Sequence, residues 1–263
     1  MGSDAEIYIF DHKIYIEEVV PDFQHYLLTS QAKPWLQELI ENPHIDLELN
    51  RLYNVDLVRF CTYLSTRDLS WNHASKSSSI SWGWKERACY SRDCPERANC
   101  PYHLNNSNTN PGELNRLFEV AVCSKCLSDS QFVGRSADIN LYDKLLRNLG
   151  VDTADPIHHL LHLLSRRGFI IGYQWSNSDG IHGWLNHDET KNLFQRLDAL
   201  DLPRYEVSFS VMSSFNSKHG YQHPQYPWDA LSLSFIRTVA YMAIQVGKGI
   251  LWGNDLMSPE DYN

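Results

Sequence analysis

Residues 89–126 have the sequence CYSRDCPERANCPYHLNNSNTNPGELNRLFEVAVCSKC, which contains five of the six cysteines of the chain. At its end, Cys123-Ser-Lys-Cys126 places two thiols with two residues between them, and Cys100-Pro-Tyr-His103 offers a thiol and an imidazole at the same interval. A tetrahedral zinc site takes four Cys or His ligands, commonly as two such pairs from separate pieces of chain. The spacing therefore predicts one zinc site in this stretch.

The candidates for the four ligand positions are Cys89, Cys94, Cys100, His103, Cys123 and Cys126. One set consists of four thiolates, with Cys94 as the fourth ligand. A second set replaces Cys94 by His103 and so gives two regularly spaced pairs, and Cys89 is a third option. Four protein ligands leave no open position for water or substrate, so the predicted role of the Zn²⁺ ion is structural.

Length and composition are those of an ordinary globular protein. The chain has 263 residues, of which 43% are hydrophobic and 12% aromatic. This length permits one large domain with an insertion or two small domains. We predict a single globular domain over residues 1–263, with a cysteine-rich zinc-binding insertion at residues 82–130.

The charge balance bears on partners and location. Asp and Glu number 32 against 23 for Lys and Arg, which gives a formal net charge of −9. Such a charge disfavours nucleic acid and acidic membranes and suits a protein partner with a basic surface, although acidity can also serve solubility alone. No apolar run approaches the roughly 20 residues of a membrane span, and no secretory signal is recognised. Clustered cysteines that bind metal fit a reducing compartment, so the predicted location is cytoplasmic.

Local signals predict an α+β fold that is mostly helical, with a few short strands. Alternating residues predict a strand at 5–10, an apolar run predicts another at 169–173, and residues 249–252 are expected to add a last strand. A first helix is predicted to follow Asp11, and Pro21 is expected to end or kink it. Residues 203–215 fit either a strand or a helix, and helix is preferred. Further helices are predicted to begin at Pro34, near Asp56, at Pro111, near Ile139, after Asp155, after Asn186 and at Pro227.

The histidines of the second half suggest an enzymatic alternative. His158 and His162 lie four residues apart on one helical face, opposite the core face of that helix, and two imidazoles at that spacing can chelate a metal. The zinc-hydrolase pattern HExxH is absent, because His159 stands where its glutamate would be. The alternative interpretation is that these histidines have no catalytic role and face solvent or cap a helix. The sequence leaves open whether the chain is an enzyme.

A second group of acid–base residues follows in residues 179–189. His182 lies in a segment with Gly180 and Gly183, which predicts a loop that could be part of an active site. Asp188 and Glu189 come next, but the first turn of a helix already explains both carboxylates. A metal-dependent or histidine-based hydrolase is therefore the alternative function.

Scattered residues of the last third resemble the YfbM-like group of bacterial proteins. The resemblance rests on Gly183-Trp184-Leu185, Asp188-Glu189, Leu193, residues 196–200 (RLDAL), Ala240, Gly247 and Leu251. It implies no particular activity, but it is in keeping with acidic bacterial proteins that act as immunity factors or accessory partners. The predicted function is accordingly that of a soluble bacterial binding protein with a structural zinc site.

Overall fold

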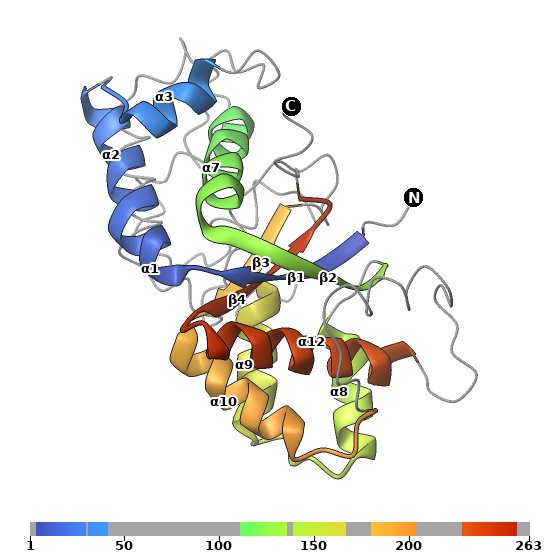
Figure 1. Cartoon of the computed structure of the whole chain (residues 1–263). Helices are drawn as coiled ribbons and strands as arrows, with labels where there is room; N and C mark the ends of the chain where they lie inside the picture. Colours follow the sequence, from blue (N-terminus) through green and yellow to red (C-terminus); the bar gives the residue numbers. More distant parts are fainter. Residues whose placement is uncertain are drawn as a thin grey trace. The chain divides into compact units, whose positions relative to one another are not determined.

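The computed structural model describes residues 4–29, 31–41, 111–135, 139–166, 180–203 and 228–256 (Figure 1). The strands are β1 (Asp4–Phe10), β2 (Leu127–Arg135), β3 (Gly180–Leu185) and β4 (Gly249–Asn254). The helical elements are α1 (His12–Ile14), η1 (Tyr15–Val19), α2 (Val20–Thr29), α3 (Pro34–Glu41), α7 (Pro111–Cys126), α8 (Ile139–Asn148), α9 (Pro156–Arg166), α10 (His187–Asp198) and α12 (Trp228–Gln245). The described part of the chain is thus mixed α and β and mostly helical, as predicted.

The chain divides into two compact units, each of which is described by itself. The first comprises Met1–His12, Leu127–Arg166 and His182–Asp255, and the second comprises Lys13–Cys126, Arg167–Ile181 and Leu256–Asn263. The predicted single domain with an insertion at residues 82–130 stays a prediction, because residues 42–110 lie outside the described part of the chain.

A four-stranded sheet with the order β2-β1-β4-β3 forms the centre of the first unit. The predicted strand β1 runs antiparallel to both of its neighbours, and Ile7 lies opposite Gln131 on one side and Trp252 on the other. Ala5, Ile7, Ile9 and Phe10 of β1 are buried, as expected for a central strand. The predicted last strand is confirmed as β4.

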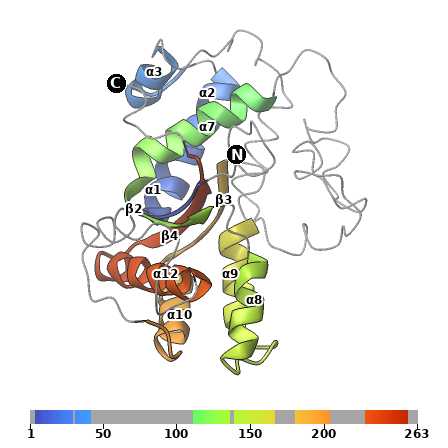
Figure 2. The ribbon, with the colours of Figure 1, turned by 90° about the vertical axis from the view of Figure 1, so that its right-hand side faces the viewer.

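Helix α12 packs against this sheet and α10 packs on α12, while α8 and α9 lie side by side (Figure 2). The helix predicted to begin at Pro227 is confirmed as α12. It is a central core element, with the buried residues Leu231, Leu233, Phe235, Ile236, Val239, Ala240 and Ala243. Val246 continues the apolar pattern of α12 in the sequence but is 60% exposed. The reason is that the helix ends at Gln245 and the chain turns at Gly247, whose φ is 70°.

The predicted helix ends of the first unit are confirmed by their hydrogen bonds. Asp155 accepts a bond of 2.8 Å from the backbone N–H of Ile157 at the start of α9. Asn186 and Glu189 exchange two bonds of 2.9 Å, which form a capping box at the start of α10. Gly150 adopts a φ of 78° after α8, as a glycine that ends a helix does.

Two strands were not predicted. β2 carries Ser128, Asp129 and Ser130, so its sequence lacks the apolar alternation of β1. The loop predicted around His182 is wrong from Gly180 to Leu185, because these residues form β3. A side chain at Gly249 would overlap the carbonyl oxygen of Leu185, so only glycine fits where the start of β4 passes this strand end. The predictions for residues 56–64, 169–173 and 204–215 lie outside the described residues.

In the second unit, α7 packs on η1 and α3. Phe118 of α7 meets Phe23 edge to face, with 5.0 Å between the ring centroids. Of the two outcomes predicted for Pro21, the end of the first helix is wrong, because the helix continues as α2. The turn before it has π geometry, with the Val20 N–H bonded to the Tyr15 carbonyl, and this wider turn accommodates the proline ring and its missing N–H.

Within the described ranges, no helix combines the length and the apolar character needed to cross a membrane.

Candidate functional site

Two of the predicted zinc ligands, Cys123 and Cys126, lie in the last turn of α7. Each is 2% exposed, and neither is in a disulfide. Side chains three residues apart lie on the same face of a helix, so Cys123 and Cys126 are neighbours there. The other predicted ligands Cys94, Cys100 and His103, and the option Cys89, lie outside the described residues.

A buried carboxylate accompanies this cysteine pair. Glu119 precedes Cys123 by one helical turn and is 1% exposed. The pKa of the Cys123 thiol lies well above its ordinary value, first because burial penalises the thiolate and then because of the charges of Glu119 and Cys126. A metal ion reverses this preference, since a zinc-bound thiol is deprotonated. The surroundings of Cys123 are therefore unfavourable to a bare thiolate.

The sequence interpretation missed Glu119. The available signal was a single acidic residue in an apolar run, one turn before Cys123. In the structure, its neighbours Leu117, Phe118 and residues 120–122 (VAV) are all buried. Glutamate is rarely fully buried without a compensating group. Within the described residues, no three His, Cys, Asp or Glu side chains form a group that could hold a metal. The Cys123–Cys126 pair thus supplies at most half of a four-ligand site, and the zinc site stays a prediction.

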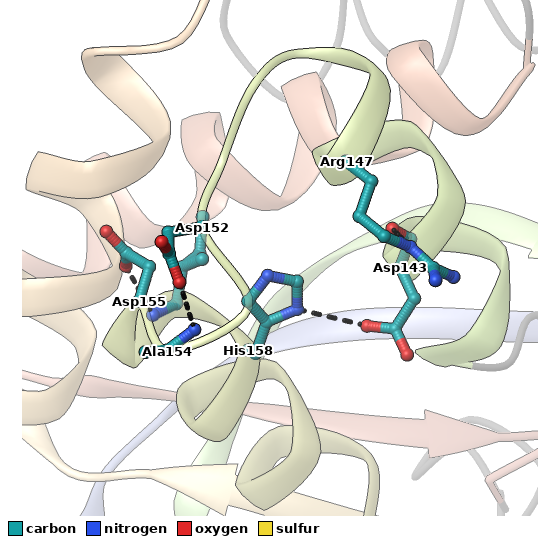
Figure 3. A network of polar contacts seen from close by, with 7 residues as sticks. Asp143, Arg147, Asp152, Ala154, Asp155 and His158 are labelled. Atoms are coloured by element: carbon teal, nitrogen blue, oxygen red, sulfur yellow. Dashed lines mark hydrogen bonds and ion pairs between the residues drawn. The ribbon is translucent and has the colours of Figure 1, made fainter.

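A second polar cluster joins α8 and α9 (Figure 3). The Nδ1 atom of His158 lies 3.1 Å from the Oδ1 atom of Asp143. The His158 side chain is 13% exposed, so the expectation of a solvent-facing histidine is wrong for this residue. The cause is the short connection between α8 and α9, which packs the two helices together and turns the ring towards α8. His159 is exposed, whereas His162 is partly buried.

The other polar groups of this cluster have local structural roles. Arg147 donates from Nε to the backbone carbonyl of Asp143 at 3.0 Å. Asp152 accepts from the Ala154 N–H at 2.7 Å. Asp155, besides capping α9, accepts from Arg196 at 2.8 Å. Asp143 is thus the carboxylate of this cluster that contacts His158.

The contact with Asp143 determines what the His158 ring can do. An ionised carboxylate accepts the proton of Nδ1, which leaves a lone pair on Nε2. The Nε2 atom is buried and has no hydrogen-bond partner among the described residues. Such a nitrogen can bind a metal or accept a proton, but its burial keeps it from a substrate in solution.

The remaining predicted acid–base groups are not gathered into one site in the described part of the chain. His182 is a half-buried residue of β3, and His187 places its Nδ1 atom 3.3 Å from the carbonyl of Lys248. The carboxylate of Glu189 lies in the first turn of α10, as predicted, and belongs to its capping box. Asp179 lies outside the described residues.

Comparison of the chain with protein-family models, with curated proteins and with solved structures returned no match. The resemblance to YfbM-like proteins therefore stays an expectation from the sequence.

Proposed function

We propose that the chain is a binding protein whose cysteine-rich region is stabilised by one structural zinc ion. Cys123 and Cys126 supply two of the ligands, and Cys94, Cys100 and His103 are the candidates for the other two, with Cys89 as a further option. The observation that carries the proposal is the burial of both described cysteines at the end of one helix, beside a buried glutamate.

The energetic argument for a metal rests on these three side chains. Without a cation, Glu119 and Cys126 oppose the ionisation of Cys123, and the second unit buries titratable groups in an apolar helix interface. A divalent ion bound by the two thiolates would offset their charges, and the negative charge of Glu119 would attract the ion at longer range. A site with four protein ligands then stabilises the fold and leaves no position for a substrate.

Binding is favoured over catalysis by the burial of His158. This histidine has the carboxylate partner that an acid–base catalyst needs, but its second nitrogen is buried. The net charge of −9 steers association with a basic protein surface. We propose that this binding protein is an immunity-type inhibitor or an accessory partner protein.

The hydrolase alternative has the Asp143–His158 contact as its one favourable observation. Catalysis would require the Nε2 atom to become exposed when α8 and α9 move apart. Turnover of a small substrate that His158→Ala abolishes and His159→Ala leaves unchanged would establish this alternative in place of the binding function.

Elemental analysis of the purified chain tests the zinc part of the proposal. We expect about one zinc per chain, its loss in Cys123→Ser and Cys126→Ser, and its retention in Ser124→Ala, whose side chain is exposed on the same turn. Protein without stoichiometric metal would refute the zinc site.

Association kinetics with a partner isolated from the native host test the binding part. Charge reversal of the exposed residues Asp188 and Asp201 is expected to slow association without changing the metal content. The wild-type rate should fall as salt shortens the screening length below about 10 Å. A rate that does not respond to salt or to these substitutions would contradict the proposed basic partner.

A further inference from the structure

The His158 ring is held in the manner of a metal ligand. A histidine that binds a metal through one nitrogen commonly donates its other N–H to a carboxylate, which sets the tautomer and the ring orientation. Asp143 has this position, at 3.1 Å from Nδ1. Figure 3 shows the second ring nitrogen directed away from Asp143.

The second ring nitrogen of His158 needs a partner. With the proton on Nδ1, the Nε2 atom is a buried acceptor, and the described residues provide no donor for it. A buried polar atom without a partner is unfavourable. A cation bound at Nε2 would remove this cost and would use the lone pair that the Asp143 contact creates.

A second imidazole follows at the right interval on the same helix. His162 lies one turn after His158 on α9 and is partly buried. Two histidines four residues apart on a helix bind one metal ion in zinc hydrolases. The neighbouring His159 is exposed and lies on a different face, so it serves as a natural control.

We propose that His158, through Nε2, and His162 form a binding site for a divalent transition-metal ion, with Asp143 as the carboxylate that positions His158. Imidazole ligands select zinc, nickel or copper over magnesium or calcium. Among the described residues, no third His, Cys, Asp or Glu joins them. The site is distinct from the cysteine site and does not rest on the proposed function.

Equilibrium dialysis of the full chain, as purified, against Ni²⁺ tests this site. Two-dimensional NMR of the histidine ring nitrogens identifies the ligands, because paramagnetic nickel broadens the signals of the rings that bind it. We expect broadening of the His158 and His162 signals, no broadening from Mg²⁺, and recovery of the signals when excess Zn²⁺ displaces the nickel. Specific broadening of other rings alone would overturn the proposal.

Four variants separate ligation from a structural role. His158→Gln and His162→Gln, which keep side-chain volume and polarity, are expected to weaken nickel binding at least about tenfold, since each removes one imidazole of a chelating pair. Asp143→Asn is expected to weaken it by about 10-fold to 100-fold, the usual range for a carboxylate that orients a ligand. His159→Gln should bind as the wild type does.

Thermal melts followed by circular dichroism show whether each variant is folded. A folded His158→Gln that binds nickel as tightly as the wild type would overturn the proposal, as would an equal loss in His159→Gln. Should His158→Gln fail to fold, His162→Gln and Asp143→Asn decide the matter, and unchanged binding in both would also overturn it.

Discussion

Replacement of Cys123 by alanine distinguishes a zinc ligand from a buried thiol by the size of its effect on stability. In a metal-free core, the change removes one buried sulfur atom from a side chain that is 2% exposed. This loss resembles that of one buried methyl group and costs about 1 kcal/mol. A structural zinc ion contributes an apparent ~10–16 kcal/mol of binding free energy, and a single substitution that releases the ion forfeits this contribution.

Replacement of a zinc-bound Cys123 should therefore cost far more than the ~1 kcal/mol of a metal-free core, enough to remove most of the roughly 5–15 kcal/mol that stabilise a typical protein. Urea denaturation gives the free energy of unfolding, and elemental analysis of the same samples gives the zinc content. Ser124→Ala is the matched control and should lie within about 0.5 kcal/mol of the wild type, because its side chain is exposed.

The double variant Cys123→Ala/Cys126→Ala sharpens the test. If both residues bind one ion, the first substitution already releases it, so the second should add little. A cost near 1 kcal/mol for each single variant, additive in the double variant and without loss of zinc, would refute the reasoning.

Three further predictions concern packing, capping and pH, each read from unfolding free energies. Gly249→Ala should lower the free energy of unfolding by about 2 kcal/mol or more, since its methyl group would overlap the Leu185 carbonyl oxygen. The methyl group of Gly150→Ala meets no atom, so this variant should lose only about 1 kcal/mol because of its φ of 78°. Equal losses in the two variants would contradict the close approach at Gly249. Asp155→Ala should cost about 1 kcal/mol, and an unchanged stability would exclude its role as the α9 cap. For protein freed of metal by a chelator, the folded-state pKa of Cys123 lies well above the ordinary thiol value of 9.0, so the unfolded chain loses its proton first as pH rises. Stability should then decline above about pH 9 by up to about 1.4 kcal/mol per pH unit, and a decline as steep in Cys123→Ala would assign the effect to other groups.

Much of the secondary structure could be predicted because its signals are local. A proline in the first turn, an Asn–Glu capping box and a glycine with positive φ act within one turn of helix, so α3, α7, α9 and α10 begin where the sequence indicated. The alternation in β1 is equally local. Of the candidate sites, the chain order alone predicted that α7 would carry Cys123 and Cys126 at its end.

The sequence by itself determined these helices, the central strand and the paired cysteines, because capping, periodicity and ligand spacing are properties of neighbouring residues. Only the tertiary structure decided that the polar segment Leu127–Arg135 is a strand, because its backbone hydrogen bonds come from β1, more than a hundred residues away. The same holds for the burial of Glu119 and for the contact of His158 with Asp143, fifteen residues apart. Pairing and burial depend on which surfaces meet after the chain has folded, and no local pattern specifies that.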